Sequence, residues 1–219
     1  MDEIRNLIKN ALEEYLKIED FRNAFFKSKK IWNKDVLKEY SELTNEKDRH
    51  ELIWQYLSRL ECHISDFLSS LEELYSNEPL LLSQTGQERC LSLHLASYLK
   101  TSFPDYNVDP EYTKCLGETK EITHKTNQPE RPDILIHQQN THEKNLFAIE
   151  VKHDSKPLPK DYAKLKNLTL QDGKYHYKIG FLVNLKEKFV AIEIFINGEL
   201  ITKEPINWKP RNVIKEQIG

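Results

Sequence analysis

Apolar side chains recur at helical spacing through the first 80 residues. Near the start of the chain they follow one helical face, at Ile4, Leu7, Ile8, Leu12 and Leu16. A second run holds Leu52, Ile53, Tyr56, Leu57, Leu60, Ile64, Phe67, Leu68 and Leu71. One face of a helix returns every three to four residues, so both runs predict amphipathic helices. The segment between them predicts one or two more, with a break at residues 45–48, and we interpret residues 1–80 as an all-helical domain.

The pattern changes to short β-type runs after residue 99. One more amphipathic helix is predicted at 85–99, and the runs that follow predict strands at 106–116, 133–137, 146–152, 177–184 and 189–196. A helical pattern at 158–170 separates the third strand from the fourth, and Asn197-Gly198 is typical of a hairpin turn that folds the last strand back. This order predicts an α/β fold for residues 81–219, with a mixed central sheet flanked by helices.

Composition excludes several classes of protein. Charged residues make up 31% of the chain and hydrophobic residues 38%, with 6 glycines and 9 prolines, as is typical of a folded globular protein. No apolar run approaches the roughly 18 residues of a membrane span, and the N-terminus lacks the apolar stretch of a signal peptide, so we expect a cytoplasmic protein without membrane contact. The three cysteines match neither a disulfide framework nor a zinc pattern. A net charge of −3 gives no overall signature of nucleic-acid binding.

Three charged residues interrupt two of the predicted apolar strands. If Asp133 pairs with Glu150, the turn falls in the polar stretch QQNTHEKN, and Leu135 then lies opposite Ala148. Directly opposite residues of an antiparallel pair have Cβ atoms about 5 Å apart and point to the same face. The spacing therefore predicts two carboxylates that face each other.

Lys152 follows Glu150 by two residues, so the two side chains share one face of the strand. Three apolar residues cover the opposite face: Phe147, Ile149 and Val151. Like charges opposite each other destabilise a sheet, and burying them costs several kcal/mol without compensation. A divalent cation would compensate them, and hard oxygen ligands suit Mg²⁺ or Mn²⁺. The alternative is that Glu150 and Lys152 pair with cross-strand neighbours on a solvated sheet face.

A metal held by such carboxylates suits phosphodiester hydrolysis. It would acidify a bound water and neutralise the charge that develops on the phosphate. A nearby lysine could orient or deprotonate the attacking water, or stabilise the transition state. The hypothesis is therefore a nuclease centre built on Asp133, Glu150 and Lys152.

The same residues carry a resemblance to a known family. RPDILI, followed seventeen residues after Asp133 by EVK, resembles the PD-(D/E)xK signature of the restriction-endonuclease-like nuclease superfamily. In that superfamily a Pro-Asp pair opens one strand and E-x-K lies on the next. The resemblance covers roughly residues 84–196, and residues 1–80 have no counterpart in it. It implies a metal-dependent nuclease with a restriction-endonuclease-like fold.

The resemblance also implies roles for single residues. Asp133 and Glu150 would be metal ligands, and the Val151 carbonyl could supply a further ligand. Lys152 would be the catalytic lysine. Many members carry another acid on the helix that precedes the sheet, and Glu88 occupies that position here, as a metal ligand and part of the catalytic set.

Glu88 has a second interpretation. The stretch TGQE, which ends at Glu88, fits a capping box in which the glutamate satisfies an amide at the helix start. However, Leu91, Leu95 and Leu99 follow at helical spacing, so Glu88 begins the face that packs on the sheet. An acid at that edge is well placed for a metal.

Basic residues near the hairpin could contact nucleic acid. Between residues 152 and 178, seven lysines face three aspartates, which suits either a solvated helix face or a phosphate-facing edge. Four residues are candidate nucleic-acid contacts: Arg131, Lys156, Lys160 and Lys164. Arg131 could instead pair with Glu130. Lys164 could instead be a surface lysine, or an accessory polar residue of the site as in some members of the superfamily.

The sequence predicts a Mg²⁺- or Mn²⁺-dependent nuclease behind a helical region. The resemblance favours DNA over RNA as the substrate. The helices of residues 1–80 could form a homodimer, bind a protein partner or hold substrate. Two other functions stay open: a non-catalytic nucleic-acid-binding or scaffold protein that keeps the fold, and a helical interaction module supported by the sheet. The intact set of Asp, Glu and Lys argues against the first of these.

Overall fold

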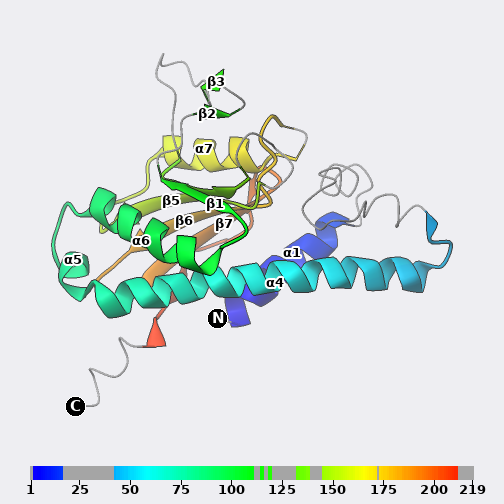
Figure 1. The fold of residues 1–219 in the computed structure, drawn as a ribbon, viewed down its shortest axis with the longest axis horizontal. Helices are drawn as coiled ribbons and strands as arrows, with labels where there is room; N and C mark the ends of the chain where they lie inside the picture. The colour runs from blue at the N-terminus through cyan, green and yellow to red at the C-terminus, as the bar shows by residue number, and fades with distance from the viewer. Residues whose placement is uncertain are drawn as a thin grey trace.

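The computed structural model describes residues 2–16, 42–110, 114–115, 118–119, 132–138, 145–171 and 173–211. The helices are α1 (Asp2–Leu16), α4 (Glu46–Asn77), α5 (Pro79–Ser83), α6 (Glu88–Ser102) and α7 (Pro159–Thr169). The main sheet contains β1 (Asn107–Pro110), β4 (Ile134–His137), β5 (Phe147–His153), β6 (Ile179–Leu185), β7 (Val190–Ile196), β8 (Glu199–Leu200) and β9 (Ile206–Trp208). Figure 1 shows its strands β5, β6 and β7 side by side. A separate two-stranded sheet pairs β2 (Lys114–Cys115) with β3 (Glu118–Thr119).

The two long apolar runs of the first 80 residues form helices, as predicted. The break predicted at residues 45–48 marks the start of α4, where the Asn45 side chain accepts a hydrogen bond from the Lys47 amide at 2.9 Å. The helices predicted between the two runs lie outside the described residues. Among the residues that the structure describes, no helix combines the length and the apolar character needed to cross a membrane.

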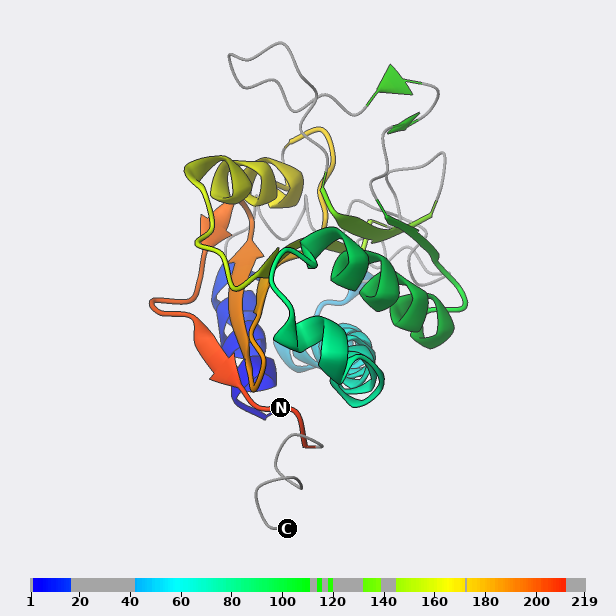
Figure 2. The ribbon, with the colours of Figure 1, turned by 90° about the vertical axis from the view of Figure 1, so that its left-hand side faces the viewer.

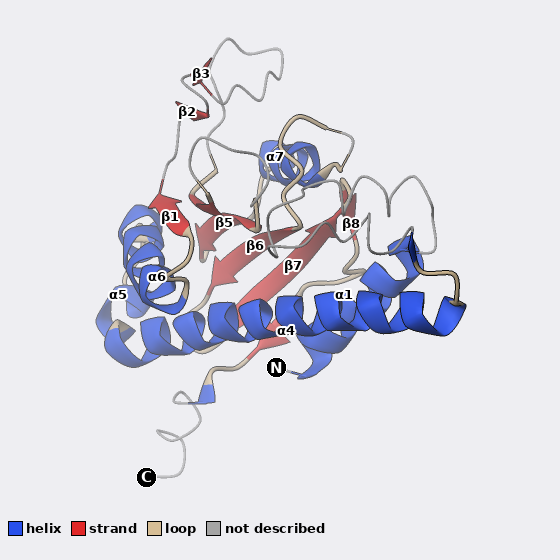
Figure 3. Cartoon of the chain, turned by 45° about the vertical axis from the view of Figure 1, so that its right-hand side comes forward, coloured by secondary structure: helices blue, strands red, loops and turns tan. Residues whose placement is uncertain are grey.

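The main sheet is mixed, which confirms the predicted α/β class. Its strand order is β1-β4-β5-β6-β7-β8, and β9 also pairs with β7. Strands β5 and β6 are parallel, and the other pairs are antiparallel. Parallel neighbours need a long crossover, and α7 supplies it between β5 and β6 (Figure 3).

Several strand boundaries differ from the prediction. The strand predicted at 106–116 is too long: β1 ends at Pro110, which has no amide hydrogen to continue the ladder, and β2 belongs to the other sheet. Strand β9 has no counterpart among the predicted strands. The Asn197-Gly198 turn is confirmed, because both residues have positive φ, 51° and 77°, and β8 folds back on β7.

Helices cover both faces of the sheet. Helix α7 lies on one face, and α1, α4 and α6 lie on the other (Figure 2). Successive side chains of β5 point to opposite faces of the sheet, as the sequence predicts. Phe147, Ile149 and Val151 lie in the core beneath α4 and α6, whereas Ala148 lies in the smaller core beneath α7.

Phe67 of α4 ties the helical region to the sheet. Its ring stacks on Phe181 at a centroid separation of 4.3 Å and meets Phe147 edge-on at 6.2 Å. Buried residues of α1, including Ile4 and Ile8, belong to the same apolar cluster. The N-terminal helices therefore share their core with the sheet, and the division into domains at residues 1–80 and 81–219 stays a prediction.

Phe67→Ala is expected to destabilise the whole chain. Deleting a buried aromatic ring costs about 3–5 kcal/mol, and this ring contacts two strands of the sheet. Urea denaturation, followed both by far-ultraviolet circular dichroism and by tryptophan fluorescence, should show one transition at a lower midpoint.

Leu80→Ala is the matched control, because Leu80 is 75% exposed and its truncation should change the free energy of unfolding by no more than about 0.5 kcal/mol. A biphasic transition in the Phe67 variant, with a sheet that unfolds at the original midpoint, would contradict the shared core.

Candidate active site

The β4–β5 hairpin has the register that the sequence predicts. Leu135 pairs with Ala148, flanked by Ile134 opposite Ile149. One further step along the same register brings Asp133 opposite Glu150, at the end of the hairpin where β4 begins. Both acids thus lie on the α7 face of the sheet, beside the start of β4.

Asp133 is held by a main-chain hydrogen bond. The Val151 amide donates to Asp133 Oδ2 at 2.7 Å, so the carboxylate continues the ladder one residue beyond β4. Burial raises the pKa of Asp133 above its ordinary value, against the opposing effects of this hydrogen bond and of the positive charges of Lys164 and Lys152. Asp133 is therefore fixed in place while its second oxygen is left for other partners.

Glu150 is a buried carboxylate held by two lysines. Its side chain is 2% exposed, and Lys164 Nζ donates to Oε1 at 2.7 Å and to Oε2 at 2.8 Å. Lys152 Nζ lies 3.5 Å from Oε1. Burial, followed by the negative charge of Asp133, raises the pKa of Glu150 to about 8, although both lysines oppose the rise. The register of the hairpin likewise places the two carboxylates opposite each other.

Lys152 lies among three carboxylates from different elements. Its Nζ is 3.1 Å from Glu88 Oε1 on α6 and 3.7 Å from Asp161 Oδ1 on α7, in addition to the Glu150 contact. Burial lowers the pKa of Lys152, but Glu150, Asp161 and Glu88 together raise it above its ordinary value. Lys152 is thus an ammonium ion at neutral pH.

Glu88 joins this cluster and is not part of a capping box. Helix α6 begins at Glu88, its N-cap residue is Gln87, and no side chain caps it. The Glu88 carboxylate instead reaches Lys152 through Oε1 and accepts from the Ser155 hydroxyl at 3.3 Å through Oε2. A recess of about 210 Å³ opens beside it, lined by Glu88 and Asp133 among others.

The cluster carries more negative than positive groups. Six side chains compose it: Glu88, Asp133, Glu150 and Asp161 are acids, and Lys152 and Lys164 are bases. When all are ionised, these six have a formal charge of −2. A proton on Glu150, which its raised pKa favours at neutral pH, removes half of that excess.

The remaining predicted residues have different positions. Lys156 and Lys160 are exposed, near the start of α7, whereas Lys164 is buried against Glu150 and is not a surface lysine. Arg131 lies outside the described residues. The contacts of all four with nucleic acid stay predictions, and so does a ligand role for the Val151 carbonyl.

His153 turns away from this cluster. The ring is buried on the opposite side of β5, with Nε2 3.1 Å from the Leu82 carbonyl oxygen. The next residue, Asp154, has a φ of 50°, a left-handed conformation that ends the strand and leads the chain back toward Ser155 and α7. This change of direction carries the Ser155 hydroxyl to Glu88.

Asp161 is a member of the cluster that the sequence pattern did not reveal. It stands third in α7, where its Oδ2 accepts from the Leu158 amide at 2.7 Å as a helix cap. Its other oxygen faces Lys152, and the side chain is 1% exposed. Pro159 at the first helical position and an acid two residues later could indicate the cap, but nothing local indicates the contact with Lys152.

The cluster has few protein ligands for a metal. Within the described residues, no group of three or more His, Cys, Asp or Glu side chains has the arrangement of a metal site. The centre offers the Asp133–Glu150 pair at its core, with Glu88 engaged by Lys152. Neither a scan against models of protein families nor a search of curated proteins finds a match to this chain.

Glu150→Gln is expected to flatten the dependence of stability on pH. Glutamate has an ordinary pKa of 4.5, and that of folded Glu150 is about 8. Between these values the folded state keeps a proton that the unfolded state releases, so the free energy of unfolding falls as pH rises. Glutamine cannot titrate, and urea denaturation in EDTA across this pH range should show the smaller slope.

Glu187→Gln makes the same change on an exposed residue of the β6–β7 turn and should keep the wild-type slope. Identical slopes for wild type and Glu150→Gln would contradict the raised pKa of Glu150.

Proposed function

We propose that this protein is a metal-dependent nuclease that hydrolyses phosphodiester bonds, with a restriction-endonuclease-like fold. The observation that carries the proposal is the convergence of Asp133, Glu150, Lys152 and Glu88, from three elements, on one end of the sheet. The sequence resemblance assigns these four residues to the same site, and their register and contacts agree with it.

The charge of the cluster supports a divalent cation as cofactor. Burial and, after it, the negative charge of Asp133 raise the pKa of Glu150, and the six-residue cluster has a formal excess of two negative charges when all its groups are ionised. Mg²⁺ is commonly bound by one or two carboxylates and keeps several waters, so it does not need a cage of three protein acids. Asp133 and Glu150 would hold Mg²⁺ or Mn²⁺, with the Val151 carbonyl and Glu88 as further candidates.

Such a cation would supply Lewis-acid activation of water and of the phosphate. Lys164 holds both oxygens of Glu150 and so fixes the position of that carboxylate. Asp133 is fixed by the Val151 amide. The pair is thereby preorganised, which removes the cost of ordering it during the reaction.

Lys152 acts in this proposal as a cation and not as a general base. Its pKa is raised by Glu150, Asp161 and Glu88, so its ammonium group keeps its protons at neutral pH. An ammonium ion can donate hydrogen bonds to the attacking water and to a phosphate oxygen, and thereby stabilise negative charge in the transition state. Lys152 is 12% exposed, which is enough for contact with a substrate.

DNA is the proposed substrate, in keeping with the resemblance. The exposed Lys156 and Lys160 follow the catalytic strand and could neutralise backbone phosphates beside the centre. Arg131 would act with them. The helices α1 and α4 offer a surface for a second copy or a protein partner.

Glu150→Ala and Lys152→Ala are each expected to reduce cleavage at least about 100-fold, the usual effect of removing a group that stabilises the transition state. The substrates are plasmid, linear, branched and single-stranded DNA and RNA, each with Mg²⁺, Mn²⁺ or EDTA. EDTA should abolish cleavage.

Lys188→Ala removes an exposed lysine from the β6–β7 turn and should cleave at the wild-type rate. If no substrate is cut, or if cutting survives both active-site substitutions, the protein is not a nuclease of this type. A non-catalytic binding protein would then retain nucleic-acid affinity without cleavage.

Mg²⁺ is expected to stabilise the folded protein. A ligand present at 100 times its dissociation constant adds about 2.7 kcal/mol to the free energy of unfolding. Thermal unfolding with and without Mg²⁺ measures this gain, which Asp133→Asn should reduce because one ligand loses its charge.

Glu187→Gln is the control for a lost surface charge and should keep the full gain. Equal stabilisation of wild type, Asp133→Asn and Glu150→Gln would place the metal elsewhere.

A further inference from the structure

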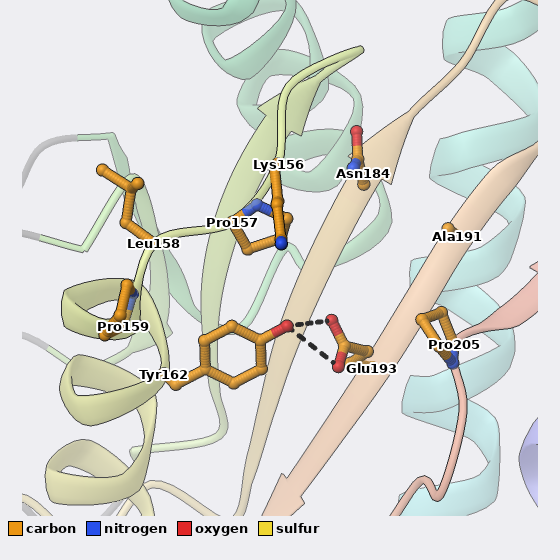
Figure 4. A pocket seen from close by; sticks show the side chains of 9 residues that line it. All are labelled: Lys156, Pro157, Leu158, Pro159, Tyr162, Asn184, Ala191, Glu193 and Pro205. Atoms are coloured by element: carbon orange, nitrogen blue, oxygen red, sulfur yellow. Dashed lines mark hydrogen bonds between the residues drawn. The ribbon is translucent and has the colours of Figure 1, made fainter.

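A second recess adjoins the catalytic cluster on the α7 side of the sheet. It has a volume of about 490 Å³, within the range of about 300–1,000 Å³ that small-molecule sites occupy. The loop from β5 to α7, strands β6 and β7, and the segment before β9 enclose it (Figure 4). Its lining includes Lys156, Pro157, Tyr162, Asn184, Glu193 and Pro205.

The sheet register connects this recess to the catalytic cluster. Glu150 pairs with Leu182 on β6, and Leu182 pairs with Glu193 on β7, so the two glutamates lie in one row across the same face. Neighbouring strands are about 4.8 Å apart, which separates the two Cα positions by about 10 Å. In the next row, Lys152 pairs directly with Asn184.

The loop residue Ser155 connects the two sites through its hydrogen bonds. The Ser155 hydroxyl donates to Glu88 on the catalytic side, and the Ser155 carbonyl accepts from Asn184 Nδ2 at 2.8 Å on the other. Ser155 therefore contacts both Asn184, which lines the recess, and Glu88, which pairs with Lys152.

The polar groups of the recess mainly accept hydrogen bonds. Glu193 is 7% exposed and accepts from the Tyr162 hydroxyl at 2.9 Å and 3.2 Å, as Figure 4 shows. The Asn184 Oδ1 atom has no hydrogen-bond donor among the described residues. Burial, followed by the hydrogen bond to Glu193, raises the pKa of Tyr162 to about 12, so its hydroxyl stays a donor to Glu193. A complementary ligand must bring N–H donors.

The other walls are apolar or cationic. Pro157, Leu158 and Pro205 supply apolar surface, and Leu158 is 50% exposed although it lines a recess. The exposed Lys156 supplies a positive charge at the loop. Ring faces suit the apolar walls, an amino group suits the buried carboxylate, and a phosphate suits the lysine. A nucleotide combines these three features in one ligand.

We propose that this recess binds an unpaired nucleobase of the substrate strand, and that Glu193 selects bases with an exocyclic amino group. This inference rests on the proposed nuclease function, because it takes the substrate to be nucleic acid. Cytosine presents an amino group where uracil presents a carbonyl oxygen, and that oxygen would face the Glu193 carboxylate. The base must be single-stranded or extruded from a duplex to reach the recess.

The test compares dCMP with dUMP, which differ only at ring positions 3 and 4: cytosine has an unprotonated N3 and an amino group where uracil has N3–H and a carbonyl oxygen. Binding is followed in EDTA by nuclear magnetic resonance of backbone amides around the recess, so it does not depend on catalysis. Wild type should bind dCMP about tenfold more tightly than dUMP, as expected for a hydrogen bond to a charged group. Glu193→Gln should abolish this preference, since the amide can donate to the uracil oxygen as well as accept.

Two further variants test the base site independently, in case Glu193→Gln does not fold. Tyr162→Phe removes the hydroxyl that orients Glu193 and should reduce the preference, and Ala191→Leu fills the recess and should weaken binding of both nucleotides. Glu187→Gln, an exposed change of equal charge, should bind as wild type does. Thermal unfolding confirms that each variant is folded.

The outcomes separate this inference from the nuclease proposal. Selective dCMP binding that Glu193→Gln abolishes supports the base site even if no substrate is cleaved. Equal binding of dCMP and dUMP, no detectable binding of either, or an unchanged preference in Glu193→Gln overturns the base site even if Lys152-dependent cleavage is observed.

Discussion

The ion pair between Glu150 and Lys164 is the interaction on which the centre depends. A carboxylate that is 2% exposed costs several kcal/mol to bury unless it is paired and hydrogen-bonded. Lys164 supplies two hydrogen bonds below 3 Å, and in doing so it fixes the rotation of α7 over the sheet. That same rotation brings Asp161, one turn earlier on α7, to Lys152. The buried Glu150 carboxylate therefore positions α7 so that Lys164 contacts Glu150 and Asp161 contacts Lys152.

The centre lies where β4 begins and β5 approaches its end, and both helical layers of the fold contribute to it there. Strand β5 directs alternate residues to opposite faces, so Val151 packs in the main core while Glu150 and Lys152 face α7. Helix α6 belongs to the other layer, yet its first residue reaches Lys152 around the end of the strand. Recesses open on both sides of the cluster, one beside Asp133 and one beside Glu193.

The apolar core beneath the centre supports the strands that carry it. Phe67 packs against the strands on both sides of the parallel pairing, so α4 supports β5 and β6 together. A site built on strands and supported by a packed helix holds its side chains more tightly than one built on loops. The helical region is thus part of the structural support of the centre, in addition to any partner that it binds.

The sequence by itself determined most of the elements and the β4–β5 hairpin, although it predicted neither β9 nor the end of β1. The alternation of residues 133–152 and the position of the polar turn predicted the β4–β5 register, because a shift of one residue would turn the charged side chains toward the main apolar core. The Asn-Gly turn and the helical runs followed from equally local rules. For Glu88, helical spacing predicted the face of the helix on which it lies, but not its ion pair with Lys152.

Only the tertiary structure decided which charges meet. Lys164 and Lys166 are the same residue type, two positions apart in α7. Lys164 is buried against Glu150, whereas Lys166 is exposed. Asp161 caps its helix by a local rule and also approaches Lys152. Glu193 enters the same row as Glu150 through two strand pairings. Periodicity specifies the face on which a side chain lies, whereas its partner depends on how separate elements pack, which no local pattern records.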